Sequence, residues 1–176
     1  TMTIEEKYQD LCLKPSDIYQ HLPTLKKYAT GCDFVVELGV RGLVSTWALL
    51  AGKPKQMISV DIEDPKTYGG DVWEVYDATN AEFIDWEFVK KSSLEIVLPV
   101  HDFLFIDTLH TYNQLTAELE LHHTKVNKFI AMHDTNLAGD PDRMRQAVND
   151  FLDKNSQWEI AELFENNNGL TVLGHT

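Results

Sequence analysis

The chain has 176 residues, a length that suits one domain whose core needs no covalent staples. Apolar residues make up 43% of it, which is typical of a folded globular protein and not of a disordered one. Its 15 basic and 28 acidic residues give a formal charge of −13, which argues against a general nucleic-acid binder or a protein that docks on anionic lipid.

Neither a secretion signal nor an apolar run long enough to cross a bilayer is recognised in the sequence. The two cysteines, Cys12 and Cys32, have the spacing of neither a metal site nor a disulfide framework. We therefore expect a soluble, cytoplasmic protein with no nucleic-acid partner and no membrane association. A homodimer stays open, because a small core with few insertions leaves a site that a second copy could complete.

In chain order, residues 1–32 predict a helical extension in two pieces, which we expect to act as a lid. Ser16 is the expected cap of the second piece, and Gly31 fits its end. From residue 33 onward, short apolar runs alternate with helical segments. The expected strands are 34–38, 57–61, 86–89, 103–107 and 129–132, and the expected helices are 43–52, 71–82, 92–97, 111–123 and 141–153.

The C-terminal end has a different pattern. Residues 158–164 and 170–173 predict two strands, and ENNNG at 165–169 predicts the turn of a hairpin between them. Asp140 and Pro141 predict the cap and first residue of the helix before this hairpin. The whole pattern predicts an α/β fold with a doubly wound, Rossmann-like, seven-stranded sheet, mostly parallel with a C-terminal antiparallel hairpin.

Polar residues stand at the ends of three predicted strands. Asp61 and Asp107 each close a strand, and the pair His133-Asp134 follows the fifth one. Ligands of doubly wound sheets bind at the carboxyl ends of the strands. We therefore expect these side chains to converge on one site.

The turn after the first expected strand reads ELGVRG from residue 37. Gly39 and Gly42 permit a tight turn and a close approach of a ligand to the backbone. Ser45 and Thr46 open the next helix, where hydroxyls and free amides could hold an anion. Arg41 fills the place of the middle glycine of the dinucleotide fingerprint, which weakens a pyrophosphate-binding interpretation.

Asp61 lies at the end of the second expected strand, where an acid accepts hydrogen bonds from ribose hydroxyls. VVELGVRGLVST, the acid in ISVDIED and the closing hairpin resemble the class I S-adenosylmethionine-dependent methyltransferases. The resemblance covers residues 33–174 and implies a methyltransferase domain over 33–176, within a single domain overall.

The same resemblance implies a set of cofactor contacts. Glu37 and the two glycines of the turn would hold the methionine part of S-adenosyl-L-methionine, and Asp61 its ribose. Ser92 and Ser93 would border the adenine. The remaining expected contacts are Ser45, Thr46 and Asp107.

FLFIDTLHTY and FIAMHDT narrow the resemblance to small metal-dependent O-methyltransferases, including catechol and sugar O-methyltransferases and the cephalosporin-hydroxylase-like group. It implies that Asp107, Asp134 and His133 bind a divalent metal. Those families have an acid or amide at or beside the place of His133, and a histidine suits manganese, iron or zinc better than magnesium. In an alternative arrangement His133 points inward and only the two acids bind.

His110 follows Asp107 by three residues, on the loop that enters the next helix. A protonated sugar or phenol hydroxyl is a weak nucleophile, and a coordinated divalent cation lowers its pKa. A histidine nearby can then remove the proton. In the sugar-modifying relatives a histidine at this spacing is the proposed base, so the resemblance implies that His110 is the catalytic base.

The expected function is therefore S-adenosylmethionine-dependent O-methylation of a small molecule or sugar, assisted by magnesium or manganese. Two alternatives stay open: a metal-independent methyltransferase with His110 as its only base, and a non-catalytic domain that keeps the cofactor pocket. A nicotinamide-dependent oxidoreductase is disfavoured by Arg41 and by the closing hairpin.

Overall fold

The computed structural model describes the whole chain, residues 1–176. Its seven strands form one sheet in the order β3-β2-β1-β4-β5-β7-β6. Their bounds are β1 Phe34–Leu38, β2 Gln56–Asp61, β3 Asp85–Lys90, β4 His101–Ile106, β5 Val126–His133, β6 Trp158–Phe164 and β7 Leu170–His175. Strands β1 to β5 pair in parallel, and β7 pairs antiparallel with β5 and β6. The predicted fold is confirmed.

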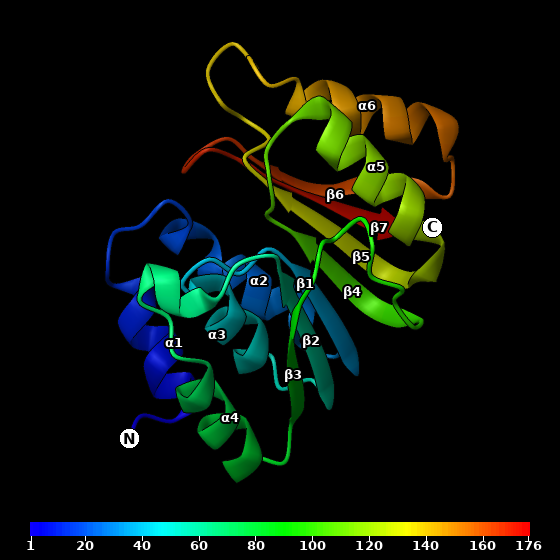
Figure 1. Ribbon diagram of the computed structural model, residues 1–176. Coiled ribbons are helices and arrows are strands. Elements are labelled where there is room, and N and C mark those ends of the chain that lie inside the picture. The colour runs from blue at the N-terminus through cyan, green and yellow to red at the C-terminus, as the bar shows by residue number, and fades with distance from the viewer.

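Helices cover both faces of this sheet (Figure 1). Their bounds are α1 Ile4–Cys12, α2 Leu22–Ala29, α3 Val44–Ala51, α4 Val72–Ala81, α5 Tyr112–His122 and α6 Met144–Lys154, with short 3-10 helices η1 Tyr19–His21, η2 Pro65–Tyr68 and η3 His123–Lys125. Helices α1 to α4 pack on one face, and α5 and α6 pack on the other. None of these helices is long and apolar enough to span a membrane.

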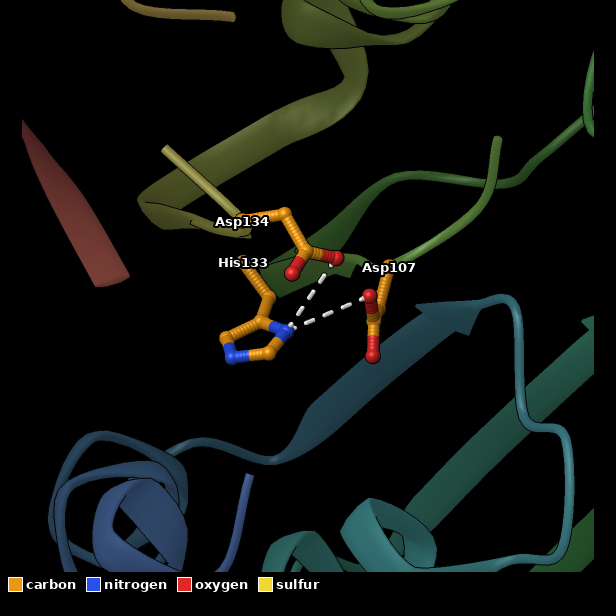
Figure 2. Close-up of side chains that lie close together, drawn as sticks. All are labelled: Asp107, His133 and Asp134. Carbon is orange, nitrogen blue, oxygen red and sulfur yellow. Dashed lines mark ion pairs between the residues drawn. The ribbon is translucent and has the colours of Figure 1, made fainter. Parts of the chain in front are cut away.

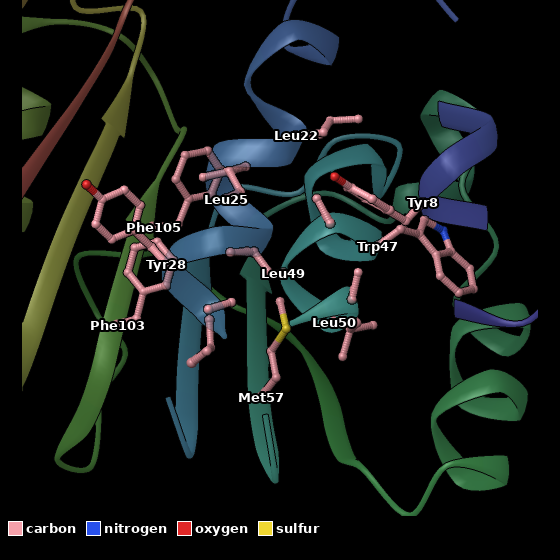
Figure 3. Packing of buried hydrophobic residues seen from close by; sticks show 14 of the residues in the cluster. Tyr8, Leu22, Leu25, Tyr28, Trp47, Leu49, Leu50, Met57, Phe103 and Phe105 are labelled. Atoms are coloured by element: carbon pink, nitrogen blue, oxygen red, sulfur yellow. The ribbon is translucent and has the colours of Figure 1, made fainter. Parts of the chain in front are cut away.

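Strand β4 shows how the two faces are filled. Phe103 and Phe105 pack with Met57 of β2 under α2 and α3 (Figure 3), and Leu104 and Ile106 pack under α5 and α6. Because both faces are covered, residues 103–106 of the strand are a continuous apolar run, which made it recognisable in the sequence. Each such side chain contributes roughly 1.5–3 kcal/mol by its burial.

The N-terminal extension is part of this core. Ile4, Leu22 and Leu25 are completely buried in the cluster that contains α3. Thr3 caps α1 by accepting a hydrogen bond from the Glu6 backbone N–H, while the Glu6 side chain accepts one from the backbone of Thr3. Residues 1–32 therefore stabilise the fold directly, and their action as a lid stays a prediction.

Three local predictions are wrong. Residues 92–97 form a turn instead of a helix, because Ser93 is held by α5: its hydroxyl donates to Glu118 and its carbonyl accepts from His122. Helix α6 begins at Met144 and not at 141, because Arg143 has a φ of +56°, a left-handed conformation that a continuous helix from 141 does not allow. Ser16 is not the cap of α2, since η1 precedes that helix and the Ser16 hydroxyl accepts from Ile18 instead.

Candidate functional site

The strand ends that carry polar residues meet at one edge of the sheet. In the order β2-β1-β4-β5, the neighbouring carboxyl ends present Asp61, the Gly39 turn, Asp107 and His133-Asp134. Two cavities open there, one of about 400 Å³ and one of about 250 Å³. Arg41, Asp107 and Thr108 line both, so the two cavities adjoin. The predicted convergence of the strand-end residues is confirmed.

Gly39 brings the turn after β1 close to the end of β4. Its φ is +87°, and a Cβ there would lie 2.1 Å from the carbonyl oxygen of Asp107. Gly42 allows a similar approach, because a Cβ there would lie 2.9 Å from the carbonyl oxygen of Tyr68. A side chain at Gly39 would force β1 and β4 apart at the point where the two cavities meet.

Asp61 and the serines after β3 line the larger cavity. The Asp61 carboxylate accepts backbone hydrogen bonds from Val40 (2.8 Å), Arg41 (3.2 Å) and Glu63 (2.9 Å), so it also holds the glycine turn. The cavity lining further includes Gly39, Tyr68, Lys91, Ser92, Ser93, Asp107, Leu109 and Gln114. Five of the predicted cofactor contacts, namely Gly39, Asp61, Ser92, Ser93 and Asp107, therefore surround one cavity.

Glu37, Ser45 and Thr46 form an internal contact. Glu37 is completely buried, and its carboxylate accepts hydrogen bonds from the hydroxyls of Ser45 (2.5 Å), Thr46 (2.6 Å) and Ser59 (2.9 Å). Burial raises the pKa of Glu37 to about 7, although the three hydroxyls act in the opposite direction. These hydroxyls join α3 to β1 and β2, and direct contact of the three residues with a cofactor stays a prediction.

Glu118 holds the far wall of the larger cavity, and sequence reasoning missed it. Its carboxylate accepts hydrogen bonds from Ser93 (2.6 Å) and Thr108 (2.7 Å) and is buried on α5. Burial raises the pKa of Glu118 in spite of these bonds. The signal in the sequence was an acid on the apolar face of a helix, beside Leu115 and Leu119.

Asp107, His133 and Asp134 form a compact cluster with one ligand atom each, all within 4.8 Å of one another (Figure 2). The Nδ1 atom of His133 lies 3.4 Å from an oxygen of Asp107 and 3.4 Å from an oxygen of Asp134. The Nδ1 edge of the ring therefore faces the acids, while the His133 side chain as a whole is buried, and metal binding by His133 together with the two acids stays a prediction. Nδ1 is buried and has no well-aligned hydrogen bond, which leaves it available as a ligand atom.

The charges of this cluster depend on one another. Burial lowers the pKa of His133, but the close carboxylates of Asp107 and Asp134 outweigh burial and raise the pKa to about 10. Burial raises the pKa of Asp107, while His133 lowers the pKa of Asp134 against the effect of burial. Two carboxylates and one imidazole suit a divalent transition metal, and without one an imidazolium satisfies the two acids.

The smaller cavity contains His110 and the two acids of the cluster. The Nδ1 atom of His110 lies 3.1 Å from an oxygen of Asp142, on the segment between β5 and α6. Sequence reasoning placed the loop 135–142 beside the site but assigned no role to Asp142 itself, because no local pattern pairs this acid with a histidine 32 residues away. An acid at Nδ1 orients the ring and leaves Nε2 as the proton acceptor.

The hairpin turn between β6 and β7 forms another wall of the site. Asn167, Asn168 and Gly169 all have positive φ, between 49° and 89°. The Asn167 carbonyl accepts from Nε2 of His133 (3.0 Å), and the Asn166 carbonyl accepts from Nε2 of His21 (2.8 Å). The sequence predicted the turn correctly, and only the structure reveals that it contacts the cluster.

Comparison with known proteins gives matches among solved structures alone. Neither a family model nor a curated sequence matches the chain. A protein from Corynebacterium glutamicum, 15% identical, superposes with a TM-score of 0.69 over 98% of this chain and 89% of that one. The O-methyltransferase TomG from Streptomyces achromogenes, solved with S-adenosylmethionine, is 16% identical, with a TM-score of 0.64 over 98% and 87%. The chain has the methyltransferase fold.

The likeness extends to enzymes of different substrates. The Bacillus subtilis tRNA methyltransferase TrmK is 16% identical, with a TM-score of 0.60 over 93% of this chain and 67% of that one. Identities this low establish the fold alone. That fold occurs both in an enzyme of tomaymycin synthesis and in a tRNA methyltransferase. The acceptor must therefore be inferred from the residues of this chain.

Proposed function

We propose that this protein is an S-adenosylmethionine-dependent O-methyltransferase that acts on a hydroxyl of a small molecule with the help of a divalent metal. The observation that carries the proposal is the position of Asp107. It lines both cavities and belongs to the cluster with His133 and Asp134. A methyl donor in the larger cavity would thus meet an acceptor in the smaller one beside the cluster.

The larger cavity fits the cofactor by size and by lining. Its volume of about 400 Å³ is within the range of small-molecule sites. Asp61 accepts three backbone hydrogen bonds and keeps a lone pair on Oδ1 for a ribose hydroxyl, and the turn at Gly39 exposes backbone to the ligand. S-adenosylmethionine would supply an electrophilic methyl group on a sulfonium, a cation that the neighbouring Asp107 carboxylate favours.

The smaller cavity supplies the acid–base chemistry. His110, oriented by Asp142, accepts the proton of the acceptor hydroxyl at Nε2. A divalent ion held by Asp107, His133 and Asp134 would lower the pKa of that hydroxyl and orient it. The imidazole ligand favours manganese, iron or zinc over magnesium.

One observation favours a second candidate, the metal-independent methyltransferase. The two acids raise the pKa of His133 to about 10, so its imidazolium can lie against both carboxylates and balance one of their two charges without a metal. In that case the cluster is structural, and His110 is the only base. The absence of a nucleic-acid partner, the homodimer and the cytoplasmic location stay predictions.

Calorimetry distinguishes the candidates. Wild type, Asp107→Ala and the control Asp77→Ala, an exposed acid on α4, are titrated with S-adenosylmethionine and with S-adenosylhomocysteine, with and without Mn²⁺ or Mg²⁺. A metal signal that disappears only in Asp107→Ala supports the metal-assisted enzyme. Cofactor binding without any metal signal supports the metal-independent enzyme, and a wild type that binds no cofactor overturns both.

A further inference from the structure

Arg41 has an unusual backbone conformation for its residue type. Its φ is +44°, in the left-handed region that glycine adopts without strain, and Leu43 nearby has a φ of +71°. The loop after β1 thus follows a glycine-like path while presenting a long cationic side chain. Strained backbone of this kind concentrates at ligand sites, which makes Arg41 a candidate for a binding role.

Several contacts hold Arg41 in place. Its backbone N–H donates to Asp61 (3.2 Å), and its guanidinium lies 3.2 Å from an oxygen of Asp17. The guanidinium carbon lies 5.9 Å from the ring centre of Tyr68. The side chains of Arg41 and Asp17 remain 70% and 48% exposed, so both can still bind another charged group. An exposed ion pair of this kind contributes little to stability, and exchanging partners costs little.

The position of the pair matches one part of the cofactor. Arg41 lines both cavities, and Asp17 lines the smaller one. The strand order places Lys91 after β3, Asp61 after β2, Arg41 after β1 and Asp107 after β4. In this order Arg41 lies between Asp61 and Asp107 and borders both cavities, so a ligand with its ribose at Asp61 and its sulfonium near Asp107 passes beside Arg41, within reach of the Arg41–Asp17 pair for its amino-acid end. That end carries one carboxylate and one ammonium.

We propose that Arg41 and Asp17 bind the amino-acid end of the sulfonium cofactor, an assignment that rests on the proposed function. The guanidinium donates to the carboxylate of the ligand, for which its planar fork is suited. The Asp17 carboxylate accepts from the ammonium group. The N-terminal extension thereby contributes Asp17 to cofactor binding. Arg41, which stands where the dinucleotide fingerprint has its middle glycine, binds the carboxylate of the ligand.

Three ligands test the carboxylate and the ammonium group of the amino-acid end separately. S-adenosylhomocysteine has both, its decarboxylated analogue has only the ammonium group, and 5′-methylthioadenosine has neither. Their dissociation constants are measured by calorimetry for wild type, Arg41→Gly, Arg41→Lys and Asp17→Asn. Arg41→Gly suits the positive φ, so the loop is expected to fold.

Each variant has its own expected pattern. Arg41→Gly lowers the affinity for S-adenosylhomocysteine by about tenfold or more and changes the affinity for the other two ligands by less than about twofold. Asp17→Asn lowers the affinity for the two ligands that carry the ammonium group and leaves the affinity for 5′-methylthioadenosine unchanged. Arg41→Lys recovers part of the affinity. Lys91→Ala, which removes the other cation of the larger cavity, is the control and affects all three ligands equally.

Two outcomes overturn the assignment alone. One is an Arg41→Gly variant that binds S-adenosylhomocysteine like wild type, and the other is one that loses all three ligands equally, as a distorted loop would. A wild type that binds none of the three ligands overturns the proposed function and the assignment with it.

Discussion

The Nε2 atom of His133 lies 3.0 Å from the backbone carbonyl oxygen of Asn167, although 34 residues separate the two in sequence. A carbonyl only accepts, so the ring carries a hydrogen on Nε2 and presents Nδ1 to Asp107 and Asp134, either as a donor of the imidazolium or, once deprotonated, as a metal ligand. The turn of the C-terminal hairpin therefore orients the histidine of the candidate metal cluster. Such outer contacts commonly fix the ligand histidines of metal sites.

Substitution at Asn167 tests this orientation. Asn167 has a φ of +49°, so Asn167→Val, with a branched Cβ, is expected to displace the turn and its carbonyl. We expect the affinity for Mn²⁺ to fall by roughly 10–100-fold, as measured by calorimetry. Asn167→Gly keeps the conformation and serves as the control, with an affinity near that of wild type. Equal affinities in both variants would contradict the role of the turn.

Gly39 is expected to be irreplaceable for a steric reason. The Cβ of Gly39→Ala would lie 2.1 Å from the Asp107 carbonyl oxygen, so the turn or β4 must move. We expect Gly39→Ala to lose about 2 kcal/mol or more of unfolding free energy and its cofactor binding. Gly31→Ala is a matched control, since Gly31 has a similar φ of +88° and no atom within 4 Å of the added Cβ.

The Gly31→Ala control should lose only about 1 kcal/mol, the cost of the left-handed conformation. Chemical denaturation measures both variants, and calorimetry with S-adenosylhomocysteine measures binding. Similar losses in the two variants would show that backbone conformation matters and the close approach to Asp107 does not.

The raised pKa of Glu37 predicts that the free energy of unfolding depends on pH. Its pKa is raised from 4.5 to about 7, mainly by burial, so the folded state holds the proton that the unfolded state releases. The stability that this residue contributes is complete below pH 4.5 and falls as the pH rises to about 7. The loss amounts to roughly 3 kcal/mol and stays constant at higher pH.

The comparison between wild type and Glu37→Gln isolates this effect. Denaturant unfolding at pH values from 4.5 to 8 gives the difference in unfolding free energy between the two proteins. We expect wild type to lose stability relative to the variant over that range, because the amide does not titrate. A difference that is independent of pH would mean that Glu37 keeps its ordinary pKa in the fold.

His110 and Asp142 are expected to act as a pair. His110→Ala should lower the rate of methyl transfer by roughly 10²–10⁴, and Asp142→Asn by about tenfold, because the ring loses its orientation. The double variant should be no slower than His110→Ala. Single-turnover rates are measured once an acceptor is found, with S-adenosylhomocysteine affinity unchanged throughout.

The control for this pair is Asp153→Asn, an exposed acid on α6 away from both cavities, which should leave the rate unchanged. If Asp142→Asn is as fast as wild type, the contact with His110 has no function. If His110→Ala is as fast as wild type, another group is the base.

The sequence alone determined the class of sheet and the edge of it at which the candidate site lies. Strand β1 was predicted with its observed bounds, 34–38, because a strand buried on both faces is short and largely apolar, with Glu37 as its one acid. The strand-end residues Asp61, Asp107 and His133-Asp134 were found because chain position along a parallel sheet fixes the edge where they emerge. Both inferences depend on local pattern and on a rule of topology.

Only the tertiary structure decided what these residues contact. The bonds from Glu118 to Ser93, from Asp142 to His110 and from Asn167 to His133 join segments 25, 32 and 34 residues apart. The first of these replaced the helix predicted over 92–97 with a turn, and the left-handed backbone of Arg143 moved the start of α6 to Met144. Local propensity is worth a fraction of a kcal/mol per residue, so buried long-range hydrogen bonds override it.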